Sequence, residues 1–397
     1  MAGIPPEPQT TDTEPLSLVR GDAAWRLQRA IGLIPADGLG IGRRAIGLAL
    51  FTWLPIAIWA WYHQSISGIR TAEPLLTHFG VHTRLLIAIP LMVVAEGMVH
   101  SIMPRLVPYF LSSGVLPPSE SGRFREILRG MLRLRDSTLP WIFILGGAIA
   151  LSVGTPAMAS THEMDWARDP GTSGLGFGGD WFRFVGRPLF IAMLIGWMWR
   201  LILFGLLLRR ISRLPLSLVP SHPDGNGGLG FLELFPTMFA PIVFLLSAVM
   251  ASHWSHQILY HGAKLLDLRL SMVTFVVVLL VLFLGPFFVF MRPLMMAKRL
   301  AELEYGALVG RHGRMVRQKW IESLEVSDAQ GLLGAPELGP VADHITMFQT
   351  VDRMRSLPIG KRALVSVLVP AAIPLLVVVS LRIPIKDLLL GLVKAIA

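Results

Sequence analysis

The segment RLLIAIPLMVVAEGMVHSIM, residues 84–103, decides the fold class of this chain. It is mostly apolar, and at about 1.5 Å of rise per residue a helix of this length crosses roughly 30 Å of hydrocarbon. A lipid interior offers the backbone no hydrogen-bond partners, so a spanning segment of this kind must be a helix. The segment therefore predicts an integral membrane protein, and it carries Glu96 and His100 inside the span.

Six further stretches have the same length and character. They lie at residues 45–62, 139–158, 187–208, 232–254, 270–291 and 363–381. None of them alternates apolar and polar residues as a barrel strand would. We therefore predict an all-α membrane protein with about seven transmembrane helices.

Basic residues fix the predicted orientation. The regions 1–44, 104–138, 209–231 and 292–362 hold 25 of the 36 Lys and Arg residues, and the alternate regions are poor in them. Cytoplasmic loops carry the excess of positive charge in membrane proteins. The N-terminus is predicted to be cytoplasmic, and a bacterial inner membrane is the expected location.

Composition supports this class and argues against others. Hydrophobic residues make up 53% of the chain and the mean hydropathy is +0.59. A net charge of +10 would suggest nucleic acid as the partner of a soluble protein, but here loops that face anionic lipid account for it. The chain has no cysteine, which excludes disulfides and thiolate chemistry.

The regions outside the spans divide into four parts. Residues 1–44 are expected to form a cytoplasmic tail, disordered over 1–20, with an amphipathic helix at 22–34. Residues 119–138 predict a basic amphipathic helix that docks at the membrane interface, within cytoplasmic loop 104–138 of a six-span bundle over 45–291. Residues 292–362 predict a cytoplasmic helical hairpin, with its second helix at about 340–356. After the last span, the remainder of 363–397 is too short to cross again and is expected to be an interfacial helix.

Glu96 and Arg200 are the most informative charged residues. Glu96 lies about twelve residues into the second span and Arg200 about thirteen residues into the fourth, so both are expected near the bilayer centre. An unpaired charge there is costly, which predicts that the two side chains pair. His100, one helical turn after Glu96, shares its face. Two interpretations follow: a proton or ion pathway in which Glu96 titrates, or a structural ion pair that fixes helix register.

The second feature is the cytoplasmic glycine-rich loop SHPDGNGGLGFLEL, residues 221–234. Its spacing matches a dinucleotide-binding fingerprint, but no strand precedes it, so that interpretation fails. The loop is expected to form a tight turn that lets helices pack closely, with an anion site at its backbone N–H groups as the alternative. Its candidate residues are His222, Asp224, Gly225, Gly227, Gly228 and Gly230.

Histidines gather on the predicted external side. His253 and His256 are weak candidates for a metal site, and His78 and His82 have a similar spacing. No carboxylate cluster or cysteine completes such a site, so we predict no metal, and the sequence names no cofactor. The external loop 159–186 contains glycines and aromatics that are typical of an interfacial belt.

Three sequence features resemble a group of bacterial multi-pass membrane proteins. They are HPDGNGGLGFL at 222–232, RLRDS at 133–137 and a tail beginning MRSLPIGKRALV at 354–365. The resemblance implies a shared all-helical membrane fold over most of residues 40–397. It supplies no activity, substrate or catalytic residue.

Two functional hypotheses follow. The first is an oligomeric transporter or channel for a small ion or solute that uses Glu96, Arg200 and His100. The alternative is a non-catalytic membrane scaffold or accessory subunit, assembled with copies of itself or with other membrane subunits. An enzyme is not expected, because no nucleophile and base are suitably placed.

The topology can be tested with reporter fusions. A reporter fused after Arg135 is expected to be cytoplasmic and one fused near Thr172 external, because the basic regions alternate as described. Activity of a compartment-specific reporter at each site provides the measurement. Finding both reporters on the same side would contradict the seven-span arrangement.

Overall fold

The computed structural model describes residues 17–35, 38–65, 74–153, 166–167, 174–322 and 338–382. Within these residues the elements are helices and no strand is present. Seven of the helices are long and apolar enough to cross a membrane, which confirms the predicted all-α class. The chain is a multi-pass membrane protein.

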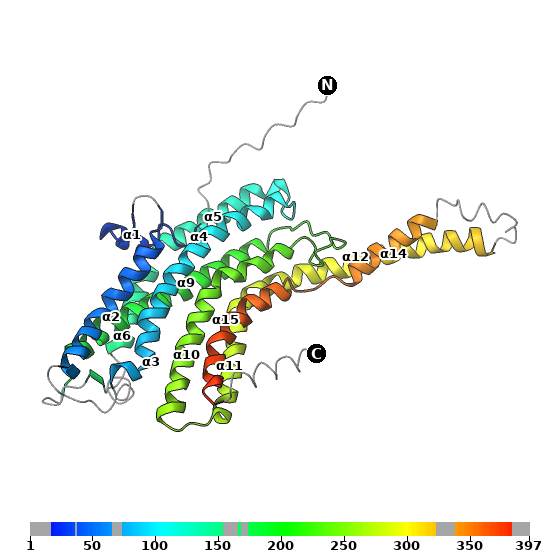
Figure 1. Ribbon diagram of the computed structural model, residues 1–397. Coiled ribbons are helices and arrows are strands. Elements are labelled where there is room, and N and C mark those ends of the chain that lie inside the picture. Colours follow the sequence, from blue (N-terminus) through cyan, green and yellow to red (C-terminus); the bar gives the residue numbers. More distant parts are fainter. Residues whose placement is uncertain are drawn as a thin grey trace.

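Each predicted span overlaps one of the main helices, and residues 154–158 of the third span lie outside the described residues. The seven are α2 (Ile41–Ser65), α4 (Ile89–Ser112), α6 (Leu139–Val153), α9 (Arg187–Ile211), α10 (Ala240–Tyr260), α11 (Leu265–Leu284) and α15 (Lys361–Ser380). They form a bundle in which α2 packs on α4, α6 on α9, and α10 on α15 (Figure 1). Their outward faces carry large exposed apolar side chains, as lipid requires.

Short helices extend or join these spans. They are η1 (Leu75–Thr77), α3 (Phe79–His82), η2 (Thr83–Ala88), η3 (Pro118–Glu120), α8 (Phe177–Trp181), η5 (Phe182–Gly186), η6 (Gly230–Phe239) and η7 (Gly285–Phe290). At η7 the backbone tightens at Pro286, which has no N–H to donate, and the helix then continues. The helical path that starts at Leu265 therefore continues without a loop through η7 and leaves the bundle.

The basic amphipathic helix predicted at 119–138 is α5 (Ser121–Asp136). Its apolar side chains Phe124 and Met131 are fully buried, and α5 packs against α9. The protein itself therefore buries part of this face, and docking of the helix at the membrane interface stays a prediction.

A two-helix arm leaves the bundle at one end (Figure 1). It consists of α12 (Met291–Arg317), which continues through η8 (Gln318–Glu322), and α14 (Leu338–Asp352), which packs along α12. The second helix had been predicted at 340–356 and ends earlier, and Met354 beyond it is buried in the bundle.

Residues 17–22 run into the bundle ahead of α1 (Ala23–Ala30). Leu18 and Val19 are buried, and the Arg135 guanidinium of α5 donates to the carbonyl of Ser17. The prediction of a disordered tail over 1–20 is therefore wrong for 17–20. Residues 1–16 and the predicted C-terminal interfacial helix over 383–397 lie outside the described residues.

Candidate functional site

Four charged side chains form a continuous chain of ion pairs inside the bundle. Glu96 Oε1 lies 3.0 Å from Arg200 Nη1, so the predicted pair is present. The other carboxylate oxygen, Oε2, lies 2.6 Å from Arg44 Nη2, and Arg200 Nη2 lies 2.8 Å from Asp22 Oδ2. We call Asp22, Arg44, Glu96 and Arg200 the ion cluster.

The ion cluster connects four segments of the chain. Arg44 comes from α2, Glu96 from α4 and Arg200 from α9, while Asp22 precedes α1. Asp22 Oδ1 also accepts a 2.7 Å hydrogen bond from the Trp25 backbone N–H and so caps α1. α1 and the segment before it are thereby joined to the transmembrane helices.

Each guanidinium of the cluster finds further contacts. Arg44 Nε donates to Gln28 Oε1 of α1 at 2.8 Å, and its Nη1 donates to the Leu39 carbonyl at 3.4 Å. The Arg200 guanidinium lies 5.0 Å from the centre of the Trp197 ring, while its buried Nε has no partner among the described residues. Cation–π contact of this kind adds to the binding of a desolvated guanidinium.

Because the four side chains of the ion cluster are buried, their charges must balance one another. Exposure is 0% for Arg44, 2% for Asp22, 3% for Glu96 and 5% for Arg200. Two cations and two anions give no net charge, so the cluster avoids the large cost of an isolated buried ion. Removing one partner from a buried pair typically destabilises a protein by about 3–5 kcal/mol.

Two members of the cluster reach it from the edge of the spans. Arg44 stands in the first turn of α2, which begins at Ile41 and runs to Ser65. Asp22 enters from outside the spans, beside α1. Glu96 itself lies near the middle of its helical path, which runs from Phe79 to Ser112.

His100 does not join the ion cluster. Its Nδ1 lies 3.5 Å from Ser17 Oγ, in the inserted segment before α1. Sequence reasoning missed Arg44 and Asp22, because Arg44 was counted with the cytoplasmic tail and Asp22 stands outside every apolar stretch. One signal was present: Arg44 directly precedes the first span, where its side chain can reach a buried carboxylate.

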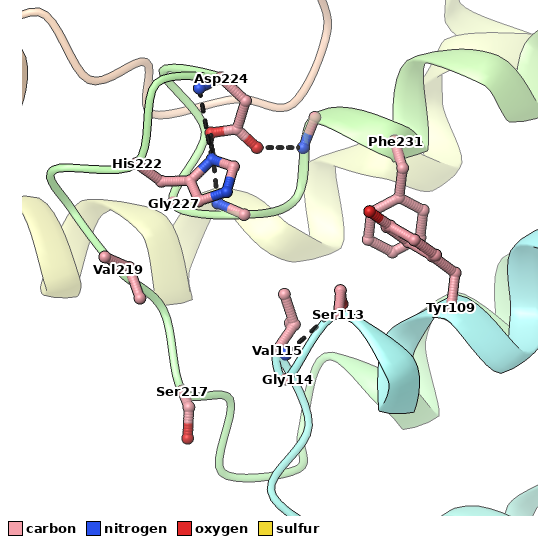
Figure 2. A pocket seen from close by; sticks show the side chains of 12 residues that line it. Tyr109, Ser113, Gly114, Val115, Ser217, Val219, His222, Asp224, Gly227 and Phe231 are labelled. Atoms are coloured by element: carbon pink, nitrogen blue, oxygen red, sulfur yellow. Dashed lines mark hydrogen bonds and ion pairs between the residues drawn. The ribbon is translucent and has the colours of Figure 1, made fainter. Parts of the chain in front are cut away.

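Asp224 organises the glycine-rich loop from within (Figure 2). Its Oδ1 accepts from the backbone N–H of Asn226 at 2.7 Å and of Gly228 at 3.2 Å, and its Oδ2 accepts from Gly230 at 2.7 Å. The anion site considered for this loop therefore already holds a carboxylate of the chain itself. Burial raises the pKa of Asp224, but these hydrogen bonds outweigh it and hold the pKa below its usual value.

The loop glycines take the conformation that was expected of them. Gly225, Gly227 and Gly228 all have positive φ, at 65°, 63° and 94°. A Cβ at Gly228 would lie 3.1 Å from the Val115 side chain, so the loop also approaches the turn after α4 closely. Both observations match the interpretation as a tight turn that permits close packing.

The loop holds the segment that joins the arm to α15. The Arg355 backbone N–H donates to the Gly225 carbonyl at 2.8 Å, and Arg355 Nη2 lies 3.0 Å from Glu233 Oε1. A cavity of about 300 Å³ opens beside the loop, and Tyr109, Ser113 and Phe231 line it opposite His222 (Figure 2). His222 Nδ1 lies 3.0 Å from Asp224, so this histidine belongs to the same hydrogen-bonded unit.

The external histidines form aromatic contacts. The rings of His78 and His256 are tilted against each other at 5.7 Å between centres, and those of His256 and His261 meet edge to face at 5.2 Å. His253 Nε2 lies 3.1 Å from the Gln257 amide nitrogen. In the part of the chain that the structure describes, no three His, Cys, Asp or Glu side chains are placed to hold a metal ion.

Comparisons of the chain with protein-family models, curated proteins and solved structures yield no match.

The ion cluster makes a stability prediction. Arg200→Gln strands Asp22 and Glu96 without their shared partner and should lower the free energy of unfolding by about 3–5 kcal/mol. Asp22→Asn combined with Arg200→Gln should recover at least half of this loss, because the Arg44–Glu96 pair remains intact and neutral overall. Thermal or denaturant unfolding in detergent provides the measurement.

Two comparisons sharpen the cluster experiment. Glu96→Gln with Arg200→Gln should recover less, because that change leaves Asp22 without Arg200 and Arg44 without Glu96. Arg317→Gln removes an exposed ion pair with Glu322 on the arm and should leave stability unchanged. Equal losses in all the cluster variants would contradict the coupling.

The glycine-rich loop makes a second prediction. Gly228→Val should destabilise the protein by roughly 2 kcal/mol or more, since it combines positive φ with a close approach to Val115. Asn226→Ser should cost less, because Asn226 Nδ2 makes only a 3.4 Å bond to Glu233 and its Oδ1 is unpaired among the described residues. Gly122→Ala, in open space within α5, is the control that should not destabilise. Similar melting temperatures for all three variants would contradict the assignment.

Proposed function

We propose that this protein is a homo-oligomeric scaffold of the bacterial inner membrane, with the arm formed by α12 and α14 on the cytoplasmic side. The observation that carries the proposal is an apolar stripe on the free face of α12. Leu300, Leu303 and Ala307 are exposed there, with Leu300 at 58% and Leu303 at 74%. On the opposite face Ala301 is buried, and Gly306, at the border of the stripe, approaches Phe348 of α14.

The spacing of the stripe suits packing against another helix. Leu300, Leu303, Ala307 and Gly310 are separated by three, four and three residues. This repeat of 3.5 residues is that of a two-stranded coiled coil, and the small residues allow close approach. We call these four residues the α12 stripe.

Charge favours a second copy of the chain as the occupant of the stripe. Arg299 and Glu304 flank the stripe at positions five residues apart, and neither makes an ion pair within the described part of the chain. In a parallel pair of helices, a residue just before the seam on one helix faces the residue five positions later on the other helix. Arg299 would then face Glu304 of a second copy, and two copies in one membrane can run parallel about an axis normal to it.

The ion cluster supports a structural role for the bundle. Its charges are balanced and nearly excluded from solvent, and it joins α1 to three spanning helices. An ion pair that fixes helix register needs each of its charges to have a partner. A proton carrier must instead be able to pass its proton on to a polar route through the membrane. Transport is the second candidate function, and it rests on Glu96 as a titratable group within the second candidate span.

Charge exchange across the α12 stripe tests the proposal. Arg299→Glu or Glu304→Arg alone should place like charges together and weaken self-association, and the double exchange should restore it. Because the chain lacks cysteine, Leu303→Cys should form a disulfide-linked dimer when native membranes are treated with an added thiol oxidant, which accepts the two electrons. Tyr305→Cys is the matched control that should not crosslink, because Tyr305 faces Ser221 at 3.4 Å.

Proteoliposomes separate the two candidate functions. Purified protein should give no ion or solute flux above that of empty vesicles. A flux that Glu96→Gln abolishes in a folded protein would establish transport instead. A chain that remains monomeric in membranes, with no crosslink at residue 303, would overturn the scaffold proposal.

A further inference from the structure

A basic groove lies where α9 ends and α12 begins. It has a volume of about 620 Å³. Arg209 and Arg213 come from the end of α9 and the residues just after it, and Arg292 comes from the first turn of α12. No acidic side chain lines this groove. The three arginines therefore create a site of strong positive potential between two helices.

These arginines are available to a ligand. All three are exposed, and none of them makes a side-chain hydrogen bond or ion pair within the residues that the structure describes. The buried Arg44, in contrast, is engaged by Gln28 and Glu96. A guanidinium is suited to phosphate because its planar fork of N–H donors matches two phosphate oxygens.

Apart from Ser212, the remaining wall of the groove is apolar. Leu214, Leu216 and Val289 line it beside the arginines. The apolar surface continues along the spans, because Ile202 lies two helical turns before Arg209 and Phe288 one turn before Arg292, with exposures of 53% and 52%. A ligand with a phosphate head and a hydrocarbon tail would contact both parts.

We infer that this groove binds the headgroup of an anionic phospholipid, with the acyl chains lying along α9 and η7. Arg210, next to Arg209 at the end of α9, approaches Gly130 of the basic helix α5, and Arg292 belongs to α12 of the arm. Both α5 and the arm belong to regions predicted to be cytoplasmic. Basic pockets between membrane helices on that side bind anionic headgroups, and the inner leaflet there supplies them. A soluble phosphate would use the arginines and leave the apolar continuation without a role.

Native mass spectrometry of the full-length protein tests the inference. Phosphatidylglycerol should be retained in preference to phosphatidylcholine with the same acyl chains. Changing Arg209, Arg213 and Arg292 together to Gln should weaken phosphatidylglycerol binding on the order of 100-fold, since each basic residue near anionic lipid contributes about a factor of five. The spectrum resolves monomers from oligomers, so altered self-association is not mistaken for lost lipid.

A matched control removes equal charge elsewhere. Arg311, Arg314 and Arg353 are exposed residues of the arm and its end, outside the groove, and changing all three to Gln should leave lipid retention within about two-fold. Melting temperatures in detergent verify that both triple variants fold. Equal retention of phosphatidylcholine, or unchanged phosphatidylglycerol binding in the groove variant, would overturn the inference. Saturation by inorganic phosphate alone, with displacement of the lipid, would identify a soluble anion site and overturn it as well.

Discussion

Charge neutrality within a low-dielectric bundle is the constraint on which this structure depends most. A carboxylate buried in α4 needs a cation beside it, and Glu96 has two, Arg44 and Arg200. One cation would be enough to balance its charge. Asp22 balances the second cation from outside the spans. The electrostatic requirement of one carboxylate thus fixes the relation of α2, α4 and α9, and also positions the segment ahead of α1.

A second polar unit organises the glycine-rich loop. The Asp224 carboxylate accepts hydrogen bonds from backbone N–H groups of the loop that would otherwise lack a partner within it. Because the shaped loop then binds the backbone of Arg355, it determines where the arm returns to the bundle and where α15 begins. The two units act differently: the ion cluster joins spans to one another, and the loop joins the arm to the spans.

The sequence alone predicts the membrane spans, because length and hydropathy decide whether a helix can cross a bilayer. It also predicted the Glu96–Arg200 contact, since the cost of an unpaired charge leaves few alternatives. Asp22 and Arg44 were missed because they reach the cluster from outside the apolar windows, through tertiary packing. Similarly, the turn at Gly228 follows from its composition, whereas the occupation of its N–H groups by Asp224 depends on how the backbone closes.

The most direct test of the ion cluster measures whether it holds residues 17–22 in the bundle. Val19 has 0% exposure, and the chain has no cysteine of its own, so Val19→Cys provides a single reporter. A water-soluble maleimide should label it slowly in the otherwise unchanged protein. Adding Asp22→Asn should speed labelling by about ten-fold or more, which corresponds to about 1.4 kcal/mol of lost protection. Equal labelling rates with and without Asp22→Asn, in proteins that remain folded, would contradict the claim that the cluster anchors this segment.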